Sequence, residues 1–90
     1  MQVRIPGLLR SYTNGAATVV LDLTGPAPTL GDALAGLDAR FPGFRFRIVD
    51  EQQAIRPHIK MFIDGELARD LNTAAGPAAE LMIVGALSGG

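Results

Sequence analysis

The sequence ends in Leu87, Ser88, Gly89 and Gly90, so its last functional group is the α-carboxylate of Gly90. A carboxylate is a poor electrophile because its negative charge repels nucleophiles, but joining it to AMP makes a mixed anhydride that a sulfur nucleophile can attack. Glycines carry no side chain, so such a tail can enter a narrow cleft of another protein without steric hindrance. A frayed terminus without function is the alternative interpretation. The ending makes Gly90 a candidate site of activation.

The side chains themselves provide little for catalysis. His58 is the only histidine and begins a predicted strand, so we expect a structural or surface role for it. Ser11 has no base near it in the sequence, and Asp50-Glu51 is typical of a solvated turn rather than an acid/base pair. With scattered carboxylates and no cysteine, we predict no metal site, no bound cofactor and no catalytic residue. If the chain takes part in chemistry, it does so as a substrate or carrier.

Length and charge favour a single small domain. Ninety residues leave no room for a second domain, and they can bury one modest core without disulfides or metals. The formal net charge is −1 and the eight basic residues are dispersed, which argues against a nucleic-acid partner. No apolar run approaches the roughly 20 residues of a membrane span, and no signal-peptide pattern is present. We therefore expect a soluble cytoplasmic protein without a membrane partner.

One helix is predicted over residues 30–41. Thr29 is a good N-cap, and Asp32, three residues later, has the position of the acid in a capping box. Arg40 complements the C-terminal end of the helix dipole, and Pro42-Gly43 ends the helix. A single apolar stripe runs along it at helical spacing, formed by Leu30, Ala33, Leu34, Leu37 and Phe41. Such a one-sided helix requires a sheet to cover.

Alternating apolar residues predict the strands of that sheet. The strands are expected at residues 2–9, 18–23, 59–63 and 81–84, with a strand-like or extended segment at 44–48 and one helical turn at 66–71. Asn14-Gly15 predicts a hairpin turn between the first two strands. Lys60, the only lysine, is expected to face solvent from the 59–63 strand.

This order of elements predicts an α+β fold of the β-grasp type, a mixed sheet with one main helix packed on one face. A ferredoxin-like arrangement is the alternative, but it needs a second full helix. We assign residues 1–86 to the β-grasp domain and residues 87–90 to a flexible tail. Four apolar residues from the helix and two strands are predicted to be core: Leu34, Leu37, Ile59 and Ile83.

Several segments in their order along the chain resemble the MoaD/ThiS family of sulfur carriers. The matching segments are residues 3–10, 29–34, 56–66 and the ending 83–90. The resemblance implies a ubiquitin-like β-grasp fold, adenylation of the C-terminal glycine by an ATP-dependent activating enzyme, and conversion to a thiocarboxylate. The sequence departs from the family pattern before the last strand, where Ala78 and Ala79 replace Gly-Asp, and at Gly85, where the family commonly has proline.

The resemblance implies a carrier that delivers sulfide from Gly90 to a biosynthetic enzyme. The opening at residues 5–10 and the Asn14-Gly15 turn are most similar to carriers that serve cysteine synthesis, with a cysteine synthase as the acceptor. The small subunit of molybdopterin synthase, partnered by the large subunit, is an alternative. A ubiquitin-like modifier that joins Gly90 to lysines and a plain interaction domain are further alternatives.

The family's hydrophobic docking position on the last strand corresponds to Val84. Strand parity places Met82 on the same side as Val84, opposite Leu81 and Ile83. Together with Leu87, Val84 and Met82 are therefore predicted to form a patch that docks the activating enzyme beside the tail residues Ser88, Gly89 and Gly90. The alternative is that the four strand residues are all core, which is common for a central strand.

Overall fold

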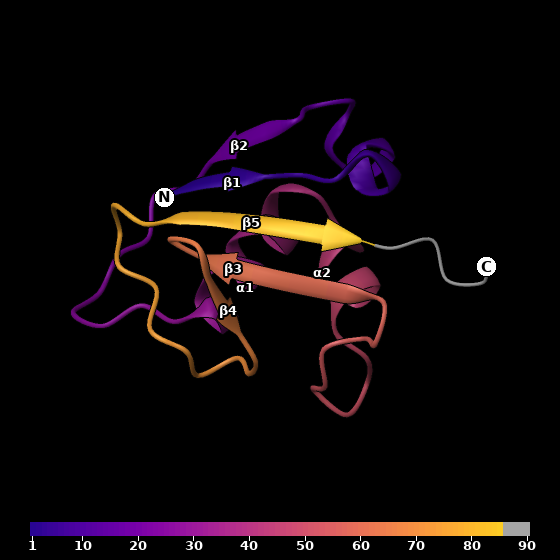
Figure 1. Ribbon diagram of the computed structural model, residues 1–90. Coiled ribbons are helices and arrows are strands. Elements are labelled where there is room, and N and C mark those ends of the chain that lie inside the picture. Colours follow the sequence, from indigo (N-terminus) through magenta and orange to yellow (C-terminus); the bar gives the residue numbers. More distant parts are fainter. Residues whose placement is uncertain (86–90) are drawn as a thin grey trace.

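The structure, a computed structural model, describes residues 1–85 (Figure 1). Its strands are β1 (Gln2–Arg4), β2 (Thr18–Val20), β3 (Ile59–Ile63), β4 (Glu66–Ala68) and β5 (Glu80–Gly85). Its helices are the 3₁₀ helix η1 (Gly7–Thr13) and the α-helices α1 (Leu30–Arg40) and α2 (Phe44–Ile48). The five strands form one mixed sheet in the order β2-β1-β5-β3-β4, in which β1 and β5 are parallel and the other pairs antiparallel. The predicted β-grasp fold is confirmed.

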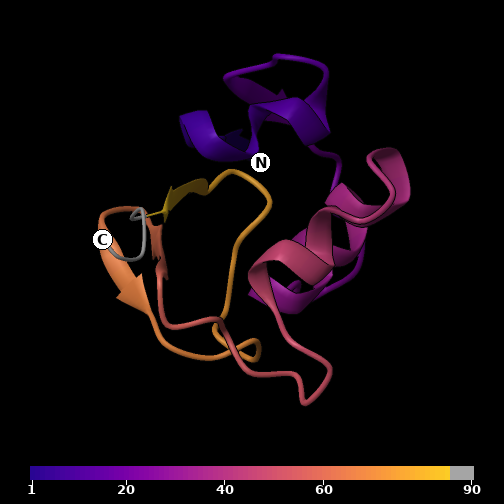
Figure 2. The ribbon, with the colours of Figure 1, turned by 90° about the vertical axis from the view of Figure 1, so that its right-hand side faces the viewer.

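The sheet and the α-helices form two layers. In Figure 1 the helices lie behind the sheet, and the view along the strands in Figure 2 separates the strands from α1 and α2. β5 lies at the centre of the sheet between β1 and β3. One face of β5 is therefore covered by helices, and the other is left open.

The predicted helix is present as α1, and its start has the predicted cap. The backbone N–H of Asp32 donates to Thr29 Oγ1 at 3.2 Å, and the backbone N–H of Thr29 donates to Asp32 Oδ2 at 2.8 Å. These reciprocal bonds satisfy two N–H groups at the helix start that would otherwise lack partners. The helix buries four of the five residues of the predicted stripe, Leu30, Ala33, Leu34 and Leu37, whereas Phe41 is the C-cap after Arg40 and is only partly buried.

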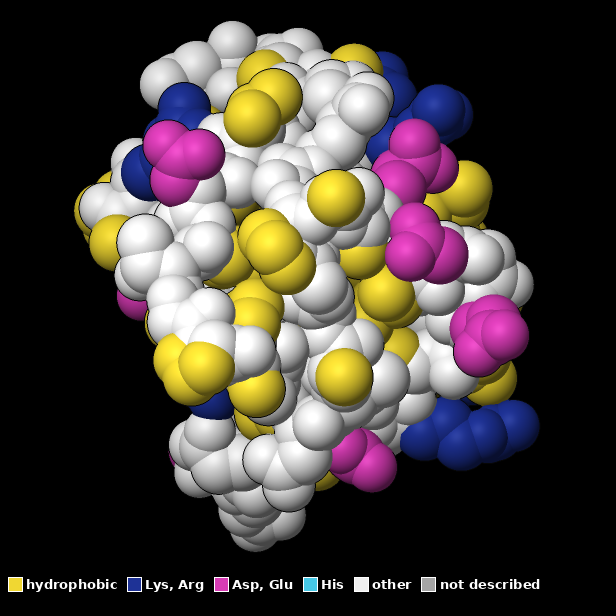
Figure 3. Space-filling view, turned by 90° about the vertical axis from the view of Figure 1, so that its left-hand side faces the viewer, with side chains coloured by type: hydrophobic (Ala, Val, Ile, Leu, Met, Phe, Trp, Pro, Cys, Tyr) yellow, Lys and Arg dark blue, Asp and Glu magenta, His cyan; other side chains and the backbone are white. Residues whose placement is uncertain are grey.

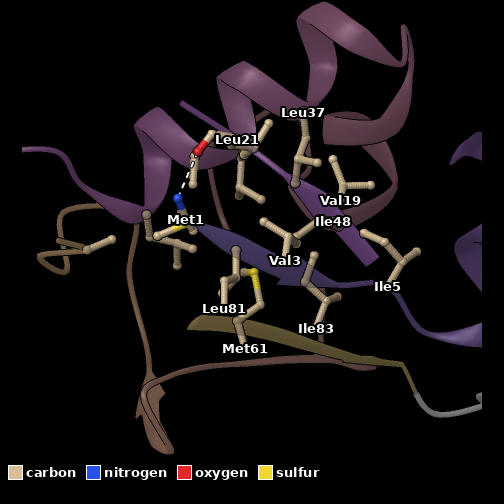
Figure 4. Packing of buried hydrophobic residues seen from close by; sticks show 14 of the residues in the cluster. Met1, Val3, Ile5, Val19, Leu21, Leu37, Ile48, Met61, Leu81 and Ile83 are labelled. Carbon is tan, nitrogen blue, oxygen red and sulfur yellow. Dashed lines mark hydrogen bonds between the residues drawn. The ribbon is translucent and has the colours of Figure 1, made fainter. Parts of the chain in front are cut away.

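The core lies between the two layers (Figure 4). The four residues predicted to be core, Leu34, Leu37, Ile59 and Ile83, are all buried, with at most 2% of their surface exposed. Figure 4 shows Leu37 pointing from α1 toward the sheet residues Val3 and Leu81. The helix is thus held by the sheet face that it covers.

The expected strand over residues 2–9 is wrong beyond Arg4. Pro6 lacks an N–H and has φ −69°, and its carbonyl accepts from the N–H of Leu9 at 3.0 Å, which begins a 3₁₀ turn. Asn14 and Gly15 adopt left-handed conformations, with φ 56° and 86°, but they end η1 instead of forming a two-residue hairpin. The connection between β1 and β2 is consequently a packed helix.

The expected extended segment at residues 44–48 is also wrong, since these residues form α2. Phe44 and Ile48 are buried and lie one helical turn apart, whereas Phe46 is 57% exposed. Gly43 has φ 94°, a conformation that glycine adopts readily, and Asp38 Oδ1 accepts from the N–H groups of Gly43 and Arg45 at 3.1 Å each. This turn therefore leads directly from the end of α1 into α2.

The expected helical turn at residues 66–71 is replaced by β4. Asp64 and Gly65 both have positive φ, 50° and 85°, which suits a two-residue hairpin turn. Ile63 then pairs with Glu66, and Phe62 with Leu67. The turn chemistry decides the structure here, because Leu67 and Leu71 at helical spacing also fit a helix.

Candidate functional site

The last strand separates apolar residues onto two faces. Leu81 and Ile83 are 0% and 2% exposed beneath the helices, whereas Met82 and Val84 are 38% and 40% exposed on the open face. The interpretation in which all four are core is therefore wrong. Exposed aliphatic side chains on a central strand are available to a partner protein.

The open face carries further apolar residues beside this strand. In the β3–β5 register Phe62 lies opposite Met82, and in the β3–β4 register Leu67 lies opposite Phe62. Directly opposed residues point to the same face and lie in contact range. We call Met82, Val84, Phe62 and Leu67 the open-face patch. Leu67 was not singled out in the sequence because its face follows only from the β3–β4 pairing, whereas the face of Phe62 already follows from alternation with Ile59 and Met61 along β3.

Leu8 of η1 reaches the end of β5 and was also missed. A Cβ atom at Gly85 would lie 2.6 Å from Leu8 Cδ2, closer than real Cβ contacts, so a glycine permits this approach of Leu8 to the backbone. Leu8 is nevertheless 40% exposed, while its neighbour Leu9 is buried. The signal in the sequence is the adjacent pair of leucines, of which a short helix can bury only one. The Cβ direction of Gly85 also meets Ile59 Cδ1 at 3.5 Å, so Leu8 contacts β5 on the side of Leu81 and Ile83, opposite Met82 and Val84.

The remaining predicted site residues follow directly after β5. Gly85 is the last described residue and pairs with Ile59 at the start of β3. Leu87, Ser88, Gly89 and Gly90 lie outside the described residues. Their proposed roles in docking and activation remain predictions.

His58 lies in a hollow near this end of the molecule. The hollow has a volume of about 330 Å³ and is lined by Leu8, Leu9, Ser11, Tyr12, Arg47 and His58. The Arg47 guanidinium stacks over the Tyr12 ring, with Cζ 5.0 Å from the ring centroid. His58 and Ser11 thus both border this hollow, and the cation–π contact joins η1 to α2 across it.

Asp50 has a structural environment. Its Oδ1 accepts from the backbone N–H groups of Ala54 at 3.0 Å and Gln52 at 2.8 Å. These hydrogen bonds, with that from Ala54 the stronger influence, lower the pKa of Asp50 because they favour the charged carboxylate. The residue closes a turn, as its position in the sequence predicted.

Two further properties describe residues 1–85. Within this part of the chain, no group of three His, Asp or Glu side chains is arranged to hold a metal ion. No helix in the same range is long and apolar enough to cross a membrane.

Solved structures match this fold along nearly the whole chain. SAMP1 from Haloferax volcanii is 30% identical with a TM-score of 0.83, covering 100% of this chain and 98% of that one. A chain of the BexX/CysO complex from Amycolatopsis orientalis is 25% identical with a TM-score of 0.82, covering 99% and 98%. Small archaeal modifier protein 1 from Methanosarcina acetivorans is 26% identical with a TM-score of 0.74, covering 99% and 94%. No protein-family model and no curated protein matches the sequence.

The β-grasp sheet and these full-length likenesses define a small ubiquitin-like protein of the carrier or modifier class. The chain belongs to the MoaD/ThiS family of ubiquitin-like sulfur carriers, as its sequence segments implied.

Proposed function

We propose that this protein is a sulfur carrier whose Gly90 carboxylate is adenylated and then converted to a thiocarboxylate. The observation that carries the proposal is the arrangement of buried and exposed residues along β5. This strand is anchored in the sheet through Leu81 and Ile83, exposes Met82 and Val84, and leads into the sequence that ends in Gly89-Gly90. A rigid strand thus presents both a recognition surface and a reactive end.

The proposed chemistry takes place in the active site of an ATP-dependent activating enzyme. A carboxylate oxygen of Gly90 attacks the α-phosphorus of ATP, and pyrophosphate leaves. Hydrosulfide from the sulfur donor then attacks the acyl carbon of the mixed anhydride, AMP leaves with the bridging oxygen, and the thiocarboxylate remains. The carrier contributes the carboxylate and the surface, while ATP is bound by the enzyme. Because the reaction consumes ATP, we place it in the cytoplasm.

The activating enzyme must read the folded domain as well as the tail, because two glycines offer little specificity. We assign this recognition to Val84 and Met82, together with Leu87. Phe62 and Leu67 widen the same surface on the open face. A few well-packed residues near the centre of an interface usually provide most of the binding energy.

For the acceptor of the sulfide we propose an enzyme of cysteine synthesis. The opening at residues 5–10 and the Asn14-Gly15 turn are most similar to carriers of that pathway. A molybdopterin-synthase large subunit is the competing acceptor. The two are distinguished by incubating the thiocarboxylated protein with each enzyme and measuring which one consumes its sulfur.

The test of the carrier function is the intact mass. Incubation with ATP, a sulfur donor and the activating enzyme from the same organism should replace one oxygen by sulfur at Gly90. Deleting Gly89 and Gly90 should abolish the change while leaving the thermal unfolding transition in place, since a terminal segment contributes little burial. An unchanged mass with an enzyme shown to activate its own related carrier would contradict the proposal.

Protein modification is the second candidate, favoured by the 30% identity to SAMP1, whose name in a second Haloferax volcanii structure is small archaeal modifier protein 1. In that case the Gly90 acyl group would be transferred to the ε-amine of a lysine, with loss of the activating group. An affinity-tagged chain expressed in its own organism should then yield larger covalent conjugates. Tandem mass spectrometry of these conjugates would identify a lysine linked to Gly90.

A further inference from the structure

The charges of the domain are distributed unevenly along the strands. Asp64 and Glu66 flank the β3–β4 turn and Glu80 begins β5, so all three lie away from the end of β5 at Gly85. Figure 3 views this far end of the molecule, where acidic side chains lie along one margin together with Lys and Arg side chains. Lys60 and Arg69, in contrast, lie beside the other end of the β3–β4 hairpin. Lys60 and Arg69 thus place two positive charges beside the end of β5 at Gly85.

A hollow at the open end of the β3–β4 hairpin, bordered by the segment that leads into β3, brings these cations together. Its volume is about 170 Å³, and its lining combines aliphatic surface with three basic side chains: Ile55, Arg56, Pro57, Ile59, Lys60, Leu67, Ala68 and Arg69. Sites for small molecules typically enclose ~300–1,000 Å³, so this hollow suits a single side chain of a partner protein. It adjoins the open-face patch, because Lys60 lies opposite Val84 and Leu67 lines both.

Two of the cations are not engaged within the domain. Arg56 Nε donates to the carbonyl of Phe46 at 2.8 Å, and its guanidinium stacks over the ring of that residue. Lys60 and Arg69 are exposed, and within residues 1–85 their side chains make no hydrogen bond or ion pair. The neighbouring carboxylate of Asp70 accepts from the N–H of Asn72 at 2.9 Å. Lys60 and Arg69 are therefore available to an anionic group from outside.

We propose that this hollow receives an acidic side chain from the activating enzyme, held by Lys60 and Arg69 while the apolar patch beside it docks. The proposal rests on the proposed function, since it names the chemistry of the surface that the enzyme must present. Charge complementarity beside an apolar contact guides the encounter and fixes the register of the partners. With Val84 as the apolar anchor, the ionic contact aligns the tail with the enzyme's nucleotide.

The experiment measures the Kd of the complex between the carrier and the activating enzyme, without ATP, so that binding is separated from chemistry. Lys60→Gln combined with Arg69→Gln should raise the Kd about fivefold at low ionic strength. The effect should shrink at high salt, because the Debye length falls from ~10 Å at 0.1 M to ~3 Å at 1 M. Lys60→Arg combined with Arg69→Lys keeps both charges and should bind within about twofold of the wild type.

A matched control places the same charge change elsewhere. Thr24→Glu combined with Ala27→Glu also lowers the net charge by two, but it lies in the exposed loop between β2 and α1, away from Gly85 (Figure 1). An equal loss of affinity in this control, or an unchanged Kd in the glutamine variant, overturns the inference. Binding without adenylation would instead contradict the proposed function and leave the ionic contact standing. Absence of wild-type binding would overturn the contact itself.

Discussion

On the face of β5 that the helices cover, Leu81 and Ile83 lose their contact with water, while on the opposite face Met82 and Val84 keep 38% and 40% of their surface exposed. All four side chains are apolar, so residue type does not explain the difference. The difference in exposure arises because successive side chains of a strand point to opposite faces and the helices cover only one face of the sheet. The core therefore takes its side chains from one face of the strand, and the other face keeps an exposed apolar surface, to which we have assigned the docking of the activating enzyme.

The largest expected effect is on the free energy of unfolding, and it is seen by truncating one leucine on each side of the sheet. Leu37→Ala removes a fully buried side chain of α1 and should lower the free energy of unfolding by about 2–5 kcal/mol. Leu67→Ala is chemically the same change on the open face and should cost less than about 1 kcal/mol, because Leu67 is already 38% exposed. Urea denaturation of both variants measures the difference. Equal losses would mean that the two faces are not distinct.

The contrast between the faces also shows how far the sequence can be interpreted. α1 was predictable because its apolar stripe spans three turns and its capping residues agree with that stripe. Phe44–Ile48 was not, because apolar residues at every second position of a five-residue segment satisfy strand alternation and helical spacing together. There the left-handed Gly43 and the capping carboxylate of Asp38 decide the structure.

The part of the candidate site that lies on a single strand was predictable, because it follows from the alternation of side chains along that strand. The parity of Met82 and Val84 follows from β5 alone. Leu8 could not be placed, because its contact with Gly85 joins opposite ends of the described chain through the sheet. Lys60 and Arg69 are likewise brought to one hollow only by the β3–β4 hairpin, which the expected helical turn would have precluded.

The second prediction tests the open face directly. Val84→Asp replaces the proposed apolar anchor by a carboxylate, which Lys60 on the paired strand can neutralise but which cannot restore the lost apolar contact with the enzyme. The efficiency of adenylation should fall about 30-fold or more, as for an interface hot spot, and the free energy of unfolding should change by less than about 1 kcal/mol. Pyrophosphate release and urea denaturation measure the two effects. Normal adenylation would remove Val84 from the docking surface, and global unfolding would assign it a role in the fold.

A smaller effect concerns the element that covers the other face. Thr29→Ala removes the side-chain acceptor for the N–H of Asp32 and should destabilise the protein by about 1 kcal/mol. Thr29 caps α1 and is not part of the open-face patch. Adenylation of the folded variant should therefore match the wild type. Thr29→Ser keeps the hydroxyl acceptor and should restore most of the stability. Loss of activity without loss of stability would show that α1 takes part in docking.

The smallest expected effect concerns the meeting point of η1 and β5. Gly85→Ala introduces a Cβ that would lie 2.6 Å from Leu8 Cδ2 and 3.3 Å from Leu8 Cγ, so the Leu8 side chain must move. That side chain is 40% exposed and can rotate, and alanine suits a strand better than glycine, so the stability should change by less than about 0.5 kcal/mol. The methyl resonances of Leu8 should nevertheless shift, and adenylation should fall about twofold if Leu8 contacts the enzyme.

In a Leu8→Ala background the Gly85→Ala change should have no further effect, because the two residues act through one contact. Additive losses of adenylation in the double variant would show that Gly85 acts through the tail that follows it, and not through Leu8.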